Sequence, residues 1–114
     1  MTGCLFCAIA NGEIPSSKAY EDGEILAFHD IRPQAPVHIL VIPKAHVAAG
    51  VGGLTEDNCA VAGRCLAVAA RLAAEMNLDG GFRVVSNNGG NACQSVPHLH
   101  FHLLGGRELS PLMG

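Results

Sequence analysis

Residues 98–104, HLHFHLL, alternate histidine with apolar side chains and constrain the fold more than any other part of the sequence. Successive side chains of a β-strand point to opposite faces. The pattern therefore predicts a strand that packs Leu99, Phe101 and Leu103 against a core. The opposite face would carry three imidazoles about 6 to 7 Å apart. These are His98, His100 and His102.

Other segments complete an α+β pattern. Residues 18–20 and 24–31 are β-like and flank Asp22-Gly23, a pair that can supply the positive φ angles of a tight hairpin turn. The mostly β-branched run 37–43 reads as a central strand, and 82–87 as a further one. With a short N-terminal helix, this order predicts helices over one face of a mainly antiparallel sheet of about five strands.

A long helix is expected over residues 55–78. Its apolar positions recur at steps of three and four, at Val61, Cys65, Val68, Leu72 and Met76. Thr55 is the expected N-cap, followed by two acidic residues that suit the positive end of the helix dipole. Residues 79–81, Asp-Gly-Gly, would end the helix, and Gly50–Gly53 would form a flexible link into it.

Composition narrows the class of protein. With 114 residues, 49% hydrophobic and 15% charged, the chain predicts one ordered domain over 1–114. A net charge of −3 without basic runs argues against binding to a nucleic-acid backbone. No signal peptide or membrane-length apolar segment is visible, so a cytoplasmic location is expected. Five cysteines, an odd number, are expected to be free thiols.

Three interpretations fit the histidine row: a half-exposed strand without special chemistry, a zinc site, and nucleophilic catalysis at phosphorus. The preceding loop favours the third. It brings backbone N–H groups, an amide and a hydroxyl next to the histidines, and such groups suit the oxygens of a phosphate in transfer. They come from Gly89, Gly90, Gln94 and Ser95.

Two long blocks resemble the histidine triad family. They are residues 94–107, QSVPHLHFHLLGGR, and 26–46, LAFHDIRPQAPVHILVIPKAH. The likeness runs from Cys4 to Arg107 and is closest to the Hint-like branch, the purine nucleoside phosphoramidases. It implies the HIT-like fold, with the two sheets of a homodimer joined into one. It also implies hydrolysis of adenosine 5'-monophosphoramidate and adenylyl-lysine-type substrates.

The resemblance assigns roles to five residues of the catalytic centre. His100 corresponds to the nucleophile that forms a nucleotidyl-histidine intermediate. His102 falls where the family binds phosphate, and His98 where a histidine supports the nucleophile. His38 matches the fourth histidine of the set, and Ser95 the serine near the leaving group.

The resemblance also outlines a purine nucleotide site. Asn87 corresponds to the asparagine at the phosphate and 5'-oxygen, and Asp30 to the carboxylate that takes the ribose hydroxyls. Gln94 lies in the expected phosphate loop. The walls of the base pocket correspond to Phe6, Phe28, His29 and Ile31.

The Cys4-x-x-Cys7 pair indicates a metal site, because two further ligands would complete a tetrahedral structural Zn²⁺ site. By resemblance to zinc-bearing members of the superfamily, these are His46 and His98. The alternative is that both cysteines are small apolar residues of the first helix.

Three other functions stay open. One is a metalloenzyme that uses the three alternating histidines as ligands. Another is a nucleotide-binding regulatory module with little turnover. The third is a dinucleoside polyphosphate or adenylyl-conjugate hydrolase of the same family.

The sequence departs from the Hint pattern at two places. It ends in Ser110-Pro-Leu-Met-Gly114 where that branch usually has Trp-Pro-Pro-Gly, and it contains no tryptophan. It also has Ala92-Cys93 before Gln94 in the phosphate loop, where the family typically has glycine.

Overall fold

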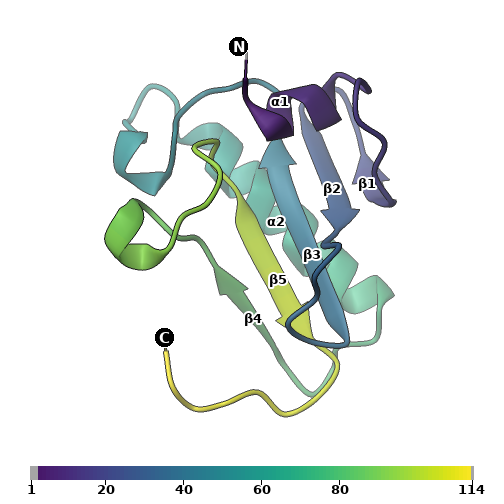
Figure 1. Ribbon diagram of the computed structural model, residues 1–114. Helices are drawn as coiled ribbons and strands as arrows, with labels where there is room; N and C mark the ends of the chain where they lie inside the picture. The colour runs from purple at the N-terminus through teal and green to yellow at the C-terminus, as the bar shows by residue number, and fades with distance from the viewer. Residues whose placement is uncertain (1–2, 114) are drawn as a thin grey trace.

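The computed structural model describes residues 3–113, and its centre is a five-stranded antiparallel sheet (Figure 1). The strands lie in the order β1-β2-β3-β5-β4. Their bounds are β1 Lys18–Glu21, β2 Ile25–His29, β3 Val37–Pro43, β4 Phe82–Val85 and β5 Phe101–Gly105. Every neighbouring pair is antiparallel, so the expected α+β fold is confirmed.

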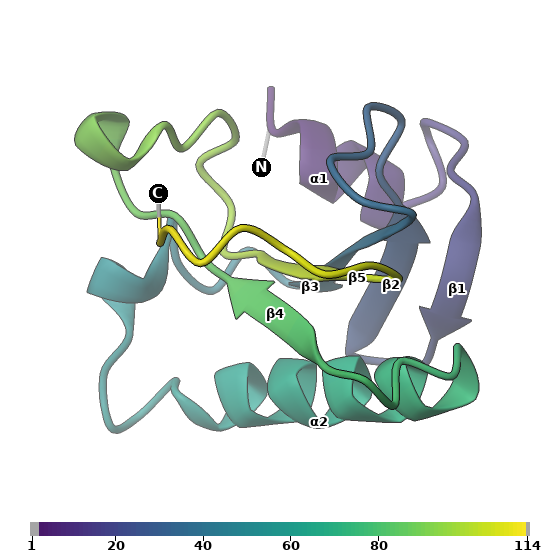
Figure 2. The same ribbon diagram turned by 90° about the horizontal axis from the view of Figure 1, so that it is seen from below.

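The two helices cover opposite faces of the sheet, as the edge-on view in Figure 2 shows. The long helix α2, Ala60–Glu75, lies on one face, and the short helix α1, Leu5–Ala10, on the other. The expectation that both helices share a face was wrong. The reason is that β2 and β3 bury side chains on both faces, as continuous apolar runs do, and each face needs a cover.

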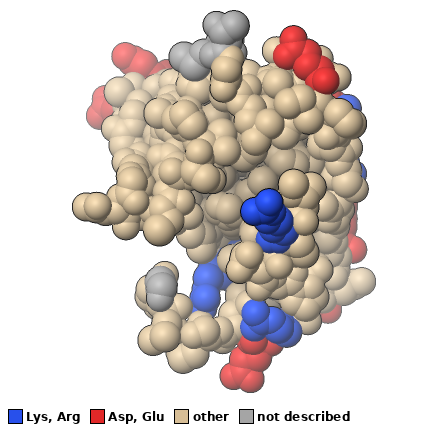
Figure 3. Space-filling model, in the orientation of Figure 1, with Lys and Arg blue, Asp and Glu red and all other residues tan. Residues whose placement is uncertain are grey.

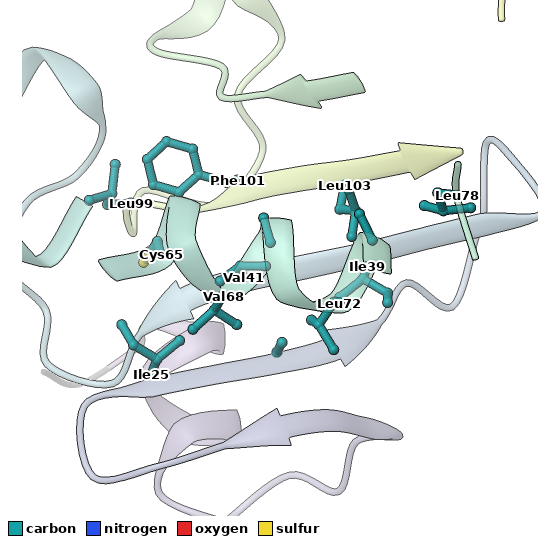
Figure 4. Close-up of a cluster of buried hydrophobic side chains, with 13 residues drawn as sticks. Ile25, Ile39, Val41, Cys65, Val68, Leu72, Leu78, Leu99, Phe101 and Leu103 are labelled. Atoms are coloured by element: carbon teal, nitrogen blue, oxygen red, sulfur yellow. The ribbon is translucent and has the colours of Figure 1, made fainter. Parts of the chain in front are cut away.

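The larger core lies between α2 and the sheet (Figure 4). Leu99, Phe101 and Leu103 belong to it, as the alternating pattern predicts, and they pack with Val68 and Leu72 of the helix. The smaller core lies under α1. Its members are Cys4, Phe6, Cys7, Ile9, Leu26, Phe28, Leu40 and Ile42.

Helix α2 begins later and ends earlier than predicted. Thr55 does not cap it, because the helix begins at Ala60 and Cys59 precedes it. The Thr55 Oγ1 accepts from the Asp57 N–H, and the Thr55 N–H donates to Asn58 Oδ1. These bonds form a separate turn before the helix begins at Ala60. At the other end Asn77 takes the left-handed conformation, with φ of 58°, ahead of the glycines expected to end the helix.

Two connections also differ from expectation. Asp22 and Gly23 keep negative φ, and the β1–β2 turn is held by the Asp22 carboxylate, which accepts from the N–H groups of Glu24 and Ile25. The glycine link, residues 50–53, is ordered and not the flexible segment that was expected. It contains a 3₁₀ helix, Val51–Gly53, and Gly52 N–H donates to Asn88 Oδ1 at 2.7 Å. Over residues 3–113, no helix has the length and apolar character that crossing a membrane requires.

Candidate active site and metal centre

The three alternating histidines lie at and just before the start of β5. His102 is in the strand, whereas His98 and His100 precede it, so the predicted strand began three residues too early. The backbone leaves the sheet there because Leu99 N–H donates to Ala48 O rather than to β3. The alternation of side chains nevertheless persists, and all three imidazoles lie on the α1 side of the sheet.

His100 is held in one tautomer. Its Nδ1 lies 2.7 Å from the carbonyl oxygen of His98, and a carbonyl only accepts, so Nδ1 carries the hydrogen. The lone pair is therefore on Nε2. The ring is 4% exposed and Phe6 contacts it edge-on, with the ring centroids 5.0 Å apart. The backbone of one histidine thus fixes the ring orientation of the next, and an imidazole held in this way can act as a nucleophile through Nε2.

His38 and His102 form a second, oriented pair across β3 and β5. Gln34 N–H donates to His38 Nδ1 at 3.0 Å, which places the His38 hydrogen on Nε2. His38 Nε2 lies 2.8 Å from His102 Nδ1 and donates to it. His102 consequently carries its hydrogen on Nε2, as a donor. The ring centroids of His102 and His100 are 5.1 Å apart, closer than the predicted spacing.

Burial keeps this pair neutral. It lowers the pKa of His102 to about 4, helped by the neighbouring His100 and His38. It also lowers the pKa of His38, against the opposing effect of the Asp30 carboxylate. Neutral rings at pH 7 are what the assigned directions of donation require.

A cavity of about 320 Å³ opens beside these histidines, under α1. Its lining includes eight of the residues implied by the family resemblance: Phe6, Phe28, His29, Asp30, Ile31, Ser95, His100 and His102. The face of the molecule that carries α1 is mostly uncharged (Figure 3). An apolar slot that ends in imidazoles and one carboxylate suits a flat, polar-ended ligand.

Sequence reasoning missed part of this lining. The segment between α1 and β1 contributes Ile14, Pro15, Ser16 and Ser17 to it. The Ser16 hydroxyl is buried and has no hydrogen-bond partner among the described residues. In the sequence, this segment is indistinguishable from an ordinary turn, because only the packing of α1 on the sheet makes it a wall.

Asn87 and Gln94, expected at the phosphate, lie outside the cavity lining. The amide of Gln94 donates to the carbonyl oxygens of Ala49 and Val96, and its Oε1 accepts from Gly89 N–H at 2.8 Å. Gln94 therefore fastens the loop to Ala49, the residue just before the glycine link. Cys93, the neighbouring departure from the family pattern, is exposed and left-handed, with φ of 60°.

A Cys₂His₂ cluster lies next to the histidine row. Its members are Cys4, Cys7, His46 and His98, and their ligand atoms are all within 4.8 Å of one another. In a tetrahedral zinc site with Zn–S near 2.3 Å and Zn–N near 2.05 Å, sulfur and nitrogen are about 3.6 Å apart. The corresponding distances are 3.4 Å for Cys4 Sγ to His98 Nδ1 and 3.4 Å for Cys7 Sγ to His46 Nδ1. The cluster fits zinc.

His98 is oriented as a metal ligand by a second contact. Its Nε2 lies 2.7 Å from Pro43 O and donates to it, which leaves the lone pair on the Nδ1 that faces the sulfurs. Burial lowers the pKa of His98 and raises that of Cys7. All five cysteines are free thiols, as expected.

The rival interpretation, three alternating histidines on one metal, does not fit the described structure. His98 groups with the cysteines, whereas His102 groups with Asp30 and His38. His100 directs Nδ1 to a backbone carbonyl. The three rings do not converge on one point.

Comparison with known proteins agrees with this geometry. Residues 11–109 match the model of the HIT domain family. Over 109 residues the chain is 49% identical to the 14 kDa zinc-binding protein of Brassica juncea, covering 93% of this chain and 95% of the relative. It is 47% identical to the adenylylsulfatase HINT1 of Arabidopsis thaliana, covering 93% and 73%.

Solved structures show the same fold. A HIT family hydrolase from Clostridium thermocellum superposes with a TM-score of 0.95 at 39% identity, covering 99% of this chain and 98% of that one. A histidine triad protein from Clostridium difficile gives a TM-score of 0.94 at 42% identity, covering 98% and 97%.

Proposed function

This chain belongs to the HIT family, the histidine triad proteins, and from that premise we propose that it hydrolyses purine nucleoside phosphoramidates through a nucleotidyl-histidine intermediate on His100. A family hydrolase of known structure shares its fold over nearly the full chain. The observation that carries the proposal is the fixed tautomer of His100, because a lone pair on Nε2 of a ring that lines the cavity is a ready nucleophile.

In the first step Nε2 of His100 attacks the phosphorus and the P–N bond breaks. The departing nitrogen takes up a proton from solvent by way of the Ser95 hydroxyl and leaves as an amine. The positive charge on the modified ring is stabilised by the His98 carbonyl that accepts from Nδ1. In the second step water attacks the phosphorus and the bond from phosphorus to Nε2 breaks. The water gives up a proton to solvent, and the nucleotide leaves with the imidazole restored.

His102 supports both steps as a hydrogen-bond donor. Because His38 donates to its Nδ1, the Nε2 hydrogen of His102 is directed to the phosphate oxygens, where negative charge develops. The base would lie in the apolar part of the cavity lined by Phe6 and Phe28, whose rings contact each other edge-on with centroids 5.6 Å apart. Asp30, at the mouth of the same cavity, would accept from the ribose hydroxyls.

We propose a structural zinc ion on Cys4, Cys7, His46 and His98, supported by the donor geometry and by the zinc-binding relative. When bound, the metal would fix the fold of this corner and supply no reactive group. The zinc cluster is linked to the active centre through Phe6, which lies between the two cysteines in sequence and contacts the rings of both His98 and His100.

A homodimer with joined sheets is also proposed. β4 is an edge strand of the described sheet, paired with β5 alone, and it carries Phe82 with 46% of its surface exposed. An unpaired edge with an exposed aromatic residue favours pairing with a second copy. Light scattering in solution tests this, and a monomer at micromolar concentration would contradict it.

The decisive experiment uses adenosine 5'-phosphoramidate with the zinc-loaded protein. We expect release of AMP, a mass increase of one nucleotidyl group on His100 in quenched samples, and loss of both in His100→Ala while AMP still binds. Unchanged turnover in His100→Ala would refute the mechanism. Binding without turnover in the wild type would favour a regulatory module.

A second candidate reaction is hydrolysis of adenylyl sulfate, favoured by the 47% identical adenylylsulfatase relative. The same nucleophile would attack the same phosphorus, with sulfate as the leaving group. Comparing kcat/KM for the two substrates ranks the two reactions. Because sulfate needs no proton to leave, Ser95→Ala should slow the phosphoramidate reaction more.

A further inference from the structure

A single N–H group of His38 lies between two acceptors. His38 Nε2 is 2.8 Å from His102 Nδ1 and 3.4 Å from Asp30 Oδ2. Since Gln34 N–H occupies Nδ1, the ring of neutral His38 has one hydrogen to give, and it is on Nε2. The imidazole of His102 and the carboxylate of Asp30 therefore compete for the same hydrogen.

The two acceptors face different parts of the substrate under the proposed function. Asp30 faces the ribose and His102 the phosphate, and both line the cavity. The other carboxylate oxygen of Asp30, Oδ1, already accepts from Arg32 N–H at 2.8 Å. A ribose hydroxyl that donates to Asp30 is therefore directed to Oδ2, the oxygen that also faces His38.

We propose that His38 couples recognition of the ribose to the chemical step. When the ribose hydroxyls engage Oδ2 of Asp30, the His38 N–H is left wholly to His102. The stronger bond at Nδ1 polarises the His102 ring, which then positions its Nε2–H on the phosphate through a short hydrogen-bond chain. His38 is 5% exposed and lies outside the cavity lining, so it acts as a positioning residue. The inference rests on the proposed function and names the sugar as the feature that this site selects.

The consequence is measurable because a distant hydroxyl should affect kcat and not only KM. Steady-state kinetics would compare adenosine 5'-phosphoramidate with its 2'-deoxy counterpart. We expect the wild type to lose about fivefold in kcat on the 2'-deoxy substrate, the effect of about 1 kcal/mol at 1.36 kcal/mol per factor of ten. KM should rise as well, because a hydrogen bond to Asp30 is lost.

The matched variant is His38→Gln. A glutamine amide places a nitrogen near the position of Nε2 but carries two hydrogens, so it can donate to Asp30 and His102 at once. Competition then disappears. We expect a lower kcat on both substrates, a kcat ratio close to one, and an unchanged KM ratio. Ser95→Ala is the control, because it slows the reaction without touching the ribose and should keep the fivefold ratio.

Equal kcat values for both substrates in the wild type would overturn the inference and leave the proposed function standing. A fivefold ratio that persists in His38→Gln would also overturn it. A wild type that hydrolyses neither substrate would refute the proposed function instead. Nitrogen NMR of the histidines tests the coupling without turnover or variants: AMP should shift His102 Nδ1 towards the hydrogen-bonded value and 2'-deoxy-AMP should not. Equal shifts would overturn the coupling.

Discussion

Replacing Cys93 with glycine should stabilise the protein. Cys93 adopts φ of 60°, in the left-handed region that costs a residue with a Cβ about 1–2 kcal/mol. Glycine removes this strain but gains about 0.5–1 kcal/mol of conformational freedom in the unfolded chain. The net gain is about 0.5–1 kcal/mol. With an unfolding entropy of about 2.1 cal/mol/K per residue, a chain of 114 residues would show a Tm higher by about 2–4 °C.

Thermal unfolding with reductant and saturating zinc measures this effect. Cys93→Ala is the control, because alanine lacks the thiol yet keeps the Cβ and therefore the strain. We expect no gain from alanine and an intermediate gain from Cys93→Asn, since asparagine tolerates the left-handed region. If Cys93→Ala raised Tm as much as glycine does, the thiol rather than the backbone would be the cause, and the reasoning would be refuted.

Three further outcomes are expected. Native mass spectrometry should find one zinc per chain, and Cys7→Ser should lose it and lower Tm, whereas Cys59→Ser should change neither. The free energy of unfolding should fall as the pH drops from about 6.5 towards 4, because His102 binds a proton in the unfolded chain at a higher pH than in the native protein, where its pKa is about 4. Thermal unfolding at pH 7 and pH 5 checks this, and His102→Gln should flatten the pH dependence. Ser16→Ala should raise the free energy of unfolding by about 1 kcal/mol, because it removes a buried hydroxyl without a partner among the described residues; a loss in chemical denaturation would contradict this.

Local patterns predicted the sheet well because they are set by neighbours in sequence. The run 37–43 is the observed β3, and the alternation at 98–104 placed Leu99, Phe101 and Leu103 in the core. The start of α2 and the side of the sheet covered by α1 were not predictable in this way. The first depends on a separate turn around Thr55, held by side-chain bonds, that precedes the helix, and the second on burial across strands far apart in sequence.

The candidate site, too, was predictable in part. Which residue types gather at the histidines was readable from motif and resemblance, and the fold brings eight of them to one cavity. The hydrogen-bond directions were not readable, because they depend on backbone groups such as Gln34 N–H and Pro43 O. Gln94 is an example: an amide side chain suits a phosphate, yet in the folded protein this amide donates to the backbone carbonyls of Ala49 and Val96.

The bond from His100 to the backbone of His98 has a consequence for mutational studies. The two contributions of His98 are chemically separable: any side-chain replacement alters the proposed metal ligand but keeps the carbonyl that orients the His100 ring. An alanine scan would therefore report only the first. Backbone chemistry is needed for the second: an α-hydroxy acid in place of Leu99 turns the 98–99 amide into an ester, whose carbonyl is a poorer acceptor and which also lacks the Leu99 N–H that donates to Ala48 O. The backbone contribution of position 98 is thus the same whichever residue type the gene encodes there.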